Sequence, residues 1–413
     1  MDITDQHIER ARNLIHLKRF DQAIVELQKA LIVDPNNFVA LVLLTSTYIQ
    51  LHEEEKSDEY TQKLLAAAPD EGISYYYRAV FLNTIEKTSE SETMIRKAIE
   101  LEPWDADFFG FLSALYIDKK KWEIALEYAN EGLNADPENT ACLNYRTICL
   151  TKLNRTEELL SSIEETLANN PEDAFSHANI GWSKLEIGDR TEARSHFLEA
   201  LKINPNNHHA KEGMKEIIRA KNPIYRFFLN YQFWISKQQG NMQWVFILGV
   251  YFGTKVIGGL ATKIPLLWIP YVGLMFFAYL TWFIEPFANI FLRFDSFGKY
   301  ALDDDEKMAA NITAICLLTA ITSVVLYFVL DYSMLVYLAL FAATVLIPLS
   351  RFYSMSARKR VGFMTYYTFG LAALGLVAVL LCFVNEGAGI VVGTAYFVGF
   401  VAYQWISNYR NIS

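Results

Sequence analysis

Little in this sequence points to catalysis or to metal binding. The 413 residues include four cysteines and seven histidines. No Cys-x-x-Cys pair occurs, and no histidine stands at metal-ligand spacing from Cys142, Cys149, Cys316 or Cys382. Metalloprotease, phosphate-loop, dinucleotide and nucleophile-elbow motifs are absent as well. The sequence therefore predicts no catalytic residue, no metal site and no cofactor, and the chain is not expected to be an enzyme.

The first half of the chain has no basic block, and charge is unevenly divided along the chain. Residues 1–220 hold 24 Lys+Arg against 38 Asp+Glu, whereas residues 221–413 hold 13 against 8. An acidic first half without an arginine-rich patch argues against nucleic acid as a partner. The first residues, Met1 to Asp5, lack the basic and apolar regions of a cleavable signal peptide. We therefore expect the acidic half to remain in the cytoplasm.

What the sequence does have is a lattice of prolines. Six of its eleven prolines are spaced by 34 residues, namely Pro35, Pro69, Pro103, Pro137, Pro171 and Pro205. Each follows a helical pattern that a proline cannot continue, so each marks a turn into the next unit. The units start at Thr4, Phe38, Gly72, Ala106, Thr140 and Ala174. The eighth position of every unit is small: Ala11, Thr45, Ala79, Ser113, Thr147 and Gly181.

The twentieth position is small in five of the six units, and Leu159 is the exception. A period of 34 residues with a terminal proline and small residues at helix crossings resembles the tetratricopeptide repeat family. The resemblance covers residues 4–220. It implies an all-α, right-handed superhelical solenoid of six repeats, each a pair of antiparallel helices. Residues 1–220 are expected to form one domain, with residues 206–219 as a capping helix at its end.

In the tetratricopeptide family, the first helix of each repeat lines a concave groove that binds peptides. Carried onto the central repeats, the groove positions form an aromatic trough with two amides. The predicted peptide-binding residues are Tyr76, Tyr77, Phe111, Asn144, Tyr145, Asn179 and Trp182. The rings would pack on side chains and the amides would hydrogen-bond a peptide backbone, unless some rings pack between repeats instead. The family's carboxylate clamp is not reproduced, so a chaperone tail is not the expected ligand.

After Pro223 the sequence becomes aromatic and then apolar. Residues 221–242 are expected to form an interfacial linker helix, or else a buried helix of the following bundle. Residues 243–413 contain six apolar runs of spanning length, which predict a multi-pass transmembrane bundle in the lipid bilayer. The runs are approximately Gln243–Thr262, Pro265–Ile284, Asn311–Leu330, Ser333–Leu349, Val361–Phe383 and Ala388–Ser407.

The predicted loops of the bundle differ in charge. Loops on the same side as the array hold seven basic residues: Arg293, Lys299, Lys307, Arg351, Arg358, Lys359 and Arg360. The loops on the other side hold one, Lys263. By the positive-inside rule, the array and both termini face the cytoplasm, and a bacterial inner membrane is the expected location. Asp303 and Glu306 are predicted to cap the helix that forms the third span.

Two functions fit this organisation. The first is a membrane-anchored scaffold or adaptor that recruits a protein or peptide partner in its groove. The second is a transporter or channel whose bundle is regulated by the array. Lys255 and Glu285 are ionisable residues in the first two spans, as a substrate pathway would require. Short loops and few charges within the spans favour the scaffold.

Overall fold

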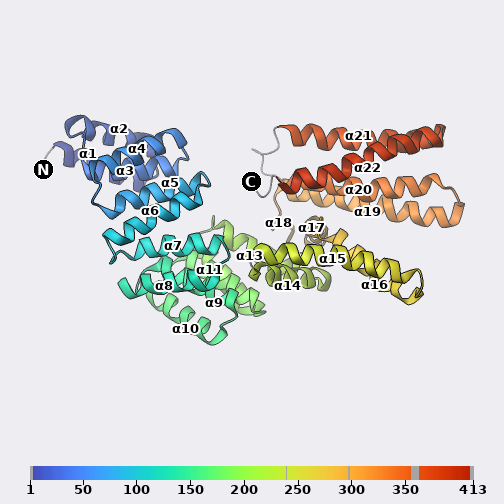
Figure 1. The fold of residues 1–413 in the computed structure, drawn as a ribbon, viewed down its shortest axis with the longest axis horizontal. Coiled ribbons are helices and arrows are strands. Elements are labelled where there is room, and N and C mark those ends of the chain that lie inside the picture. Colours follow the sequence, from blue (N-terminus) through green and yellow to red (C-terminus); the bar gives the residue numbers. More distant parts are fainter. Residues whose placement is uncertain (1–2, 239, 296–297, 355–361, 410–413) are drawn as a thin grey trace. The chain divides into compact units, whose positions relative to one another are not determined.

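Every regular element is a helix within residues 3–238, 240–295, 298–354 and 362–409, which are the residues that the computed structural model describes. The predicted all-α fold is therefore confirmed (Figure 1). The helices form two compact units. The first contains Met1–Asn207 together with Ser236–Asn241, and the second contains His208–Ile235 together with Met242–Ser413.

The first unit is an array of helices α1 to α12 that pack as consecutive pairs. In five of the six pairs, the first helix begins at the residue from which the sequence unit is counted, as α3 does at Phe38. The pairs are α1 (Ile3–His16) with α2 (Phe20–Val33), α3 (Phe38–Gln50) with α4 (Glu54–Ala67), α5 (Gly72–Thr84) with α6 (Thr88–Leu101), α7 (Ala106–Asp118) with α8 (Trp122–Ala135), α9 (Thr140–Leu153) with α10 (Thr156–Asn169), and α11 (Ala174–Glu186) with α12 (Arg190–Ile203).

Two local features recur at 34-residue spacing and set the ends of these helices. Two residues after four of the repeat prolines, a side-chain oxygen accepts a hydrogen bond from the first turn of the next helix, whereas Glu71 makes no such bond. The capping residues are Asn37, Asp105, Asn139 and Asp173. Between the two helices of each pair, one residue has a left-handed φ of 54–97°: Lys18, His52, Glu86, Lys120, Asn154 and Gly188. A left-handed residue ends one helix and turns the chain back toward the next.

The small columns of the sequence lie where paired helices cross. Ser91 Oγ donates to the carbonyl of Ala79 at 2.8 Å, a contact that requires close backbones. A Cβ atom on Gly181 would lie 2.6 Å from the ring of Phe197. Every residue at the eighth and twentieth positions is buried, including the larger Leu159. Close packing at these crossings leaves no room for larger side chains.

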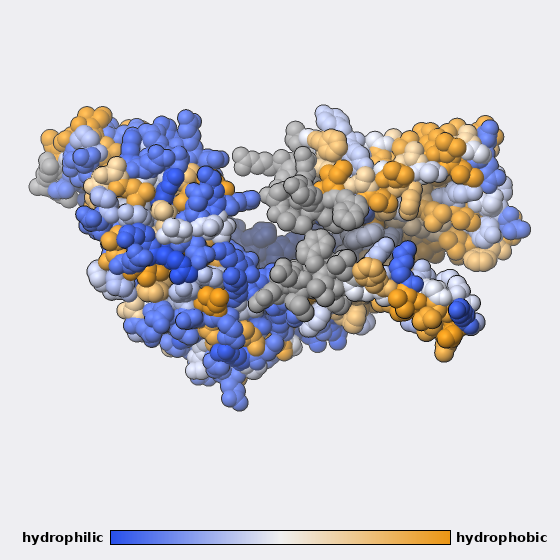
Figure 2. All heavy atoms as spheres, in the orientation of Figure 1, coloured by the Kyte–Doolittle hydropathy of each residue, from blue (hydrophilic) through white to orange (hydrophobic). Residues whose placement is uncertain are grey.

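The second unit ends in four long helices that follow a more varied set. The preceding elements are α13 (His208–Arg219), α14 (Pro223–Lys237), α15 (Gly240–Ala261), η1 (Pro265–Leu267), α16 (Trp268–Leu280), α17 (Ile284–Leu292) and α18 (Gly298–Ala301), of which α15, with 22 residues, is as long as α21. The long helices are α19 (Asp304–Leu330), α20 (Met334–Ser354), α21 (Phe363–Val384) and α22 (Glu386–Tyr409), and each packs against the next (Figure 1). Figure 2 shows apolar residues gathered on their surface, in contrast to the mostly hydrophilic array.

Four helices in the described part of the chain are long and apolar enough to cross a membrane, and they are α19 to α22. They overlap the third to sixth predicted spans. The second predicted span is divided, because Pro265–Leu280 and Ile284–Leu292 meet at a bend of 76°. The first predicted span coincides with α15, but the side chains of residues 240–248 lie outside the described residues. The predicted loop residues Arg358 to Arg360 also lie outside them.

The predicted capping helix is present as α13, but it groups with the second unit and not with the array. The boundary between the compact units therefore falls at residues 207 and 208, earlier than the predicted domain boundary at residue 220. In α14, Tyr225 and Phe228 are buried, whereas Phe227 and Trp234 are exposed. The aromatic linker thus has one face packed in protein and another face open.

Candidate functional site

Three of the five aromatic residues predicted for the groove, Tyr76, Tyr77 and Phe111, come together on α5 and α7. The Tyr76 ring stacks on Phe108 at a centroid distance of 5.3 Å, and it meets Phe111 edge-on at 5.7 Å. Tyr77 also meets Tyr76 edge-on, at 5.4 Å. Phe108 is fully buried, while the other three rings remain partly accessible. Phe108 therefore forms the buried side of the cluster, and the accessible parts of the other three rings can contact another apolar group.

Acidic groups lie beside these tyrosines. Burial is the main cause that raises the pKa of Tyr76, Tyr77 and Tyr145, and the nearby Asp107 carboxylate raises each of them further. Asp118 adds to the effect at Tyr145. The phenol groups are consequently neutral at cellular pH and retain their hydrogen-bonding protons. This combination of rings, neutral hydroxyl groups and carboxylates suits a peptide with apolar and basic side chains.

The two predicted amides lie together but are turned inward. Asn144 is fully buried, and its Nδ2 donates to the Thr140 carbonyl at 2.8 Å and to Ser176 Oγ at 2.9 Å. Asn179 is 4 % exposed and donates from Nδ2 to Asn144 Oδ1 at 3.0 Å. Both protons of the Asn144 amide are therefore used within the array. The amide pair joins α9 to α11 in this structure, and peptide contact by it stays a prediction.

Trp182 lies at the far end of the predicted groove residues, on α11. Its indole ring is half-buried and meets Phe197 of α12 edge-on at a centroid distance of 5.8 Å. Part of this ring is thus committed to packing within its own repeat, whereas the alternative considered from sequence was packing between repeats. All five predicted rings, Tyr76, Tyr77, Phe111, Tyr145 and Trp182, are partly accessible.

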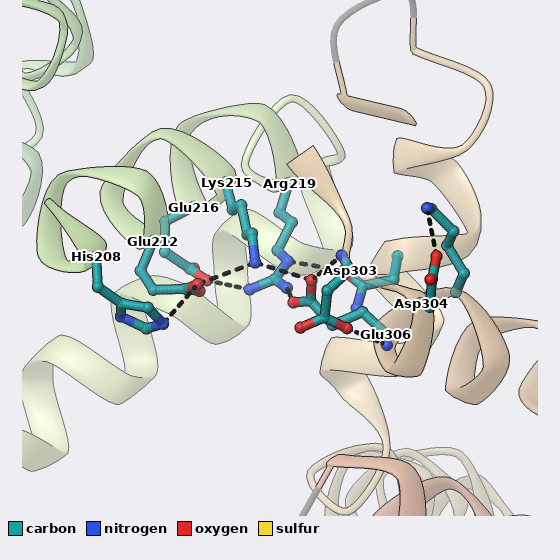
Figure 3. Close-up of polar contacts among 10 residues, drawn as sticks. His208, Glu212, Lys215, Glu216, Arg219, Asp303, Asp304 and Glu306 are labelled. Atoms are coloured by element: carbon teal, nitrogen blue, oxygen red, sulfur yellow. Dashed lines mark hydrogen bonds and ion pairs between the residues drawn. The ribbon is translucent and has the colours of Figure 1, made fainter. Parts of the chain in front are cut away.

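A second cluster consists of charged side chains that extend from α13, and we call it the α13 ion network. It was not predicted from the sequence. Lys215 Nζ donates to Glu306 Oε2 at 2.8 Å, and Arg219 Nη2 donates to Glu306 Oε1 at 3.3 Å. Arg219 also bonds to Glu216 at 2.5 Å and to Asn289 at 2.9 Å. Figure 3 shows Lys215 and Arg219 reaching from α13 toward the start of α19. The network ties α13 to α17 and α19 within the second unit.

The charges of this network are strongly shielded from water. Burial alone would lower the pKa of Lys215, but its bonds to Glu306 and Glu212 raise the pKa overall. The Arg219 side chain is 4 % exposed. Burial and the Glu216 carboxylate both raise the pKa of Tyr225, whose hydroxyl donates to Glu216 at 2.7 Å. Buried charges of this kind are tolerated because each one has a partner.

Glu306 has two roles at the start of α19. The predicted cap is confirmed as a capping box, in which Asp303 accepts from the Glu306 N–H and Glu306 accepts from the Asp303 N–H. The same carboxylate receives Lys215 and Arg219. No local sequence pattern indicates this contact, because Glu306 lies 91 residues after Lys215 and 87 residues after Arg219.

A polar pocket lies where the bent helix pair breaks. Its lining residues are Gln232, Thr281, Trp282, Ile284, Glu285, Pro286, Ser350 and Arg351. Glu285, which the sequence singled out as an ionisable residue in a span, is therefore at the wall of a pocket. The pocket contains both a carboxylate and a guanidinium, so it can accommodate a polar or zwitterionic group.

Comparison with known proteins relates the chain to repeat proteins. Residues 176–207 match the family model described as tetratricopeptide repeat. Stress-induced-phosphoprotein 1 of Caenorhabditis elegans is 21 % identical over 239 residues, which are 49 % of this chain and 74 % of that protein. Type IV pilus assembly protein PilF of Pseudomonas aeruginosa is 27 % identical over 139 residues, or 33 % of this chain. This chain spans about half, 52 %, of the length of PilF.

A solved structure of Pseudomonas aeruginosa PilF is similar to this chain at a TM-score of 0.43 and 21 % identity, covering 52 % of this chain and 97 % of that one. The sequence matches, the 34-residue lattice and the consecutive helix pairs together support tetratricopeptide repeats in the first half of the chain.

Proposed function

We propose that this protein is a membrane-anchored scaffold that binds a protein or peptide partner in the groove of its tetratricopeptide array. The observation that carries the proposal is the open ring cluster of Tyr76, Tyr77 and Phe111 beside Asp107. Grouped aromatic rings that stay partly accessible favour coverage by a partner, and the neighbouring carboxylate favours a cationic side chain in that partner. The preferred partner is an extended segment with apolar and basic side chains.

Membrane anchoring is the second part of the proposal. Helices α19 to α22 supply enough apolar length to cross a bilayer, and their outward side chains include Leu318, Phe328 and Val391 at 63–80 % exposure. Such surfaces would aggregate in water but are stable against lipid. The basic loops of the sequence favour a cytoplasmic array in a bacterial inner membrane. Partner binding would thereby be confined to the membrane surface.

A comparative pulldown tests the groove. Intact cells expressing the tagged chain are crosslinked, and captured proteins are compared between wild type and Tyr77→Ala/Tyr145→Ala. A matched control, Ile32→Ala/Val33→Ala, removes exposed apolar groups from α2. We expect one or more partners to be lost from the tyrosine variant and kept by the control. An unchanged partner set in both variants would remove the groove as the binding site.

A transporter or channel regulated by the array is a second candidate, favoured by the polar pocket that includes Glu285 and Arg351. Deleting residues 1–207 separates the two functions, because this removes the groove and leaves the bundle. Loss of the cellular phenotype in the deleted chain, with normal membrane insertion, would support the scaffold. Survival of the phenotype, combined with its loss in Glu285→Gln, would support transport.

A further inference from the structure

The array holds a segment of its own chain. Ser236 and Lys237 end α14, and Ser236–Asn241 belongs to the same compact unit as the repeats. Trp122 Nε1 donates a hydrogen bond of 2.9 Å to the Lys237 carbonyl, across 115 residues of sequence. The last carbonyl groups of a helix lack a partner within the helix. Trp122 supplies one from another part of the fold.

The side chains of the segment are held as well. Lys237 Nζ donates to Asn154 Oδ1 at 2.7 Å and lies 3.4 Å from Glu186 Oε1. Lys152 Nζ donates to Ser236 Oγ at 3.1 Å and to Glu186 Oε2 at 2.6 Å. A backbone carbonyl, a hydroxyl group and an ammonium group of two consecutive residues are thus each recognised by the array.

The residues that hold the segment come from three consecutive repeats. Trp122 begins α8, Lys152 and Asn154 lie at the end of α9, and Glu186 ends α11. Lys152 and Glu186 are one repeat length apart in the sequence. The site is therefore formed by the stacking of repeats and is absent from any single repeat.

Burial makes this contact selective for a cation. The Glu186 side chain is 6 % exposed, and its Oε1 atom has no hydrogen bond in the described part of the chain. Lys237 provides the neighbouring positive charge for this oxygen, and its own side chain is 15 % exposed. A buried carboxylate oxygen left without a cation is strongly disfavoured. If Lys237 moves out of the site, the ammonium group of another lysine can replace its positive charge beside Glu186 Oε1.

We propose that Trp122, Lys152, Asn154 and Glu186 form a recognition site for a Ser-Lys dipeptide at a helix end, and that Ser236–Lys237 is its internal ligand. The site is separate from the aromatic groove and does not depend on the groove's function. When the internal segment is released, the site accepts a lysine-containing segment supplied in trans.

The test uses the full chain in detergent and a fluorescent peptide with the sequence of residues 235–241. Wild type is compared with Ser236→Ala/Lys237→Ala, in which the internal ligand is weakened. We expect the variant to bind the peptide at least tenfold more tightly than wild type, because the site is vacated. Replacing the lysine of the peptide by alanine, or adding Glu186→Gln to the variant, should abolish the gain. Equal binding by wild type and variant, or no binding by either, would overturn the proposal.

Hydrogen exchange provides a second measurement on chains with a milder change. Trp122→Phe keeps the aromatic packing but removes the hydrogen bond to the Lys237 carbonyl. We expect exchange of residues 231–238 to be slow in wild type and at least threefold faster in Trp122→Phe. The control Lys202→Ala removes an exposed lysine paired with Glu199 and should leave this exchange unchanged. Fast exchange of the segment in wild type would contradict a bound internal ligand.

Discussion

The side-chain amide of Asn179 donates to the amide oxygen of Asn144 at 3.0 Å, and this contact joins the first helices of two adjacent repeats. Asn144 then donates to Ser176, so the contact continues as a chain of buried polar groups. Such groups stabilise a fold only when every member has its partner. Two residues expected to face a ligand thus define the spacing between repeats in this structure.

Asn144→Ala should destabilise the array. The substitution leaves the buried Asn179 amide without its acceptor, at a cost of about 1–3 kcal/mol. It also removes the donor to Ser176 Oγ, which keeps its own hydrogen bond to Asp173. Hydrogen exchange of α9 and α11 should accelerate accordingly. Asn83→Ala, which changes an amide on α5 that is not fully buried, is the matched control and should have little effect. Unchanged exchange in Asn144→Ala would mean that the amide chain does not support the stack.

The left-handed turn residues predict stabilising substitutions. His52 and Glu86 have φ values of 57° and 63°, which cost a residue with a Cβ about 1 kcal/mol relative to glycine. His52→Gly and Glu86→Gly should therefore raise the midpoint of denaturant unfolding of the array. Gly188 already has a φ of 97°, so Gly188→Ala should lower that midpoint. A lower unfolding midpoint for both His52→Gly and Glu86→Gly would show that the His52 and Glu86 side chains stabilise the array by more than the backbone strain costs.

Glu92 predicts a loss of array stability in acid. Burial raises the pKa of this carboxyl group, but hydrogen bonds from Lys119, Tyr116 and Arg96 outweigh burial and lower the pKa to about 2. The unfolded chain has a pKa of about 4.3 for glutamate, so it binds the proton first as the pH falls. The stabilisation is fully present above pH ~4.5 and is lost progressively toward pH 2.

Denaturant unfolding of wild type and Glu92→Gln at several pH values checks this expectation. The variant should be less stable near pH 6, and the difference should shrink as the pH approaches 3. Glu90→Gln is the control, because Glu90 is exposed and pairs with Lys87 only at 4.0 Å. A difference that does not change with pH would show that the Glu92 charge is not the source of the stabilisation.

Arg219→Ala should destabilise the second unit. The substitution removes the cation that Glu216 shares with Asn289 and Glu306, and breaking a buried ion pair costs about 3–5 kcal/mol. The thermal midpoint of the detergent-solubilised chain should fall by several degrees. Lys211→Ala on the exposed face of α13 should leave it almost unchanged. Equal midpoints for both variants would contradict a structural role for the α13 ion network.

Much of the fold follows from local sequence patterns. A proline fixes where a helix cannot continue, and small residues fix where two helices can cross, so Pro35 and Ala79 are informative without a structure. The same holds for Asp303 and Glu306, whose capping box involves neighbours in the chain. These features depend on residues a few positions apart or on exact repetition.

Other features depend on partners far away in the sequence. Asn144 was predicted to face a ligand because its family position does, but its partner Asn179 lies in the next repeat. The contact of Lys215 with Glu306 was not predicted, because the two residues are 91 positions apart. The break after Leu280 also escaped prediction, since residues 265–292 are apolar throughout most of their length and the 76° bend arises between two helices. The left-handed turns were missed because lysine, histidine and glutamate occupy positions where glycine would have been the usual signal.

Site-specific photocrosslinking tests the central claim most directly. A photoreactive phenylalanine derivative is placed at Tyr77 or Tyr145 in the groove, or at the exposed Ile32 as a control, and cells are irradiated before the membranes are separated. Our account predicts a discrete protein adduct in the membrane fraction from both groove positions and none from position 32. Adducts of equal yield from all three positions, or recovery of the chain in the soluble fraction, would contradict a membrane-anchored scaffold that binds its partner in the groove.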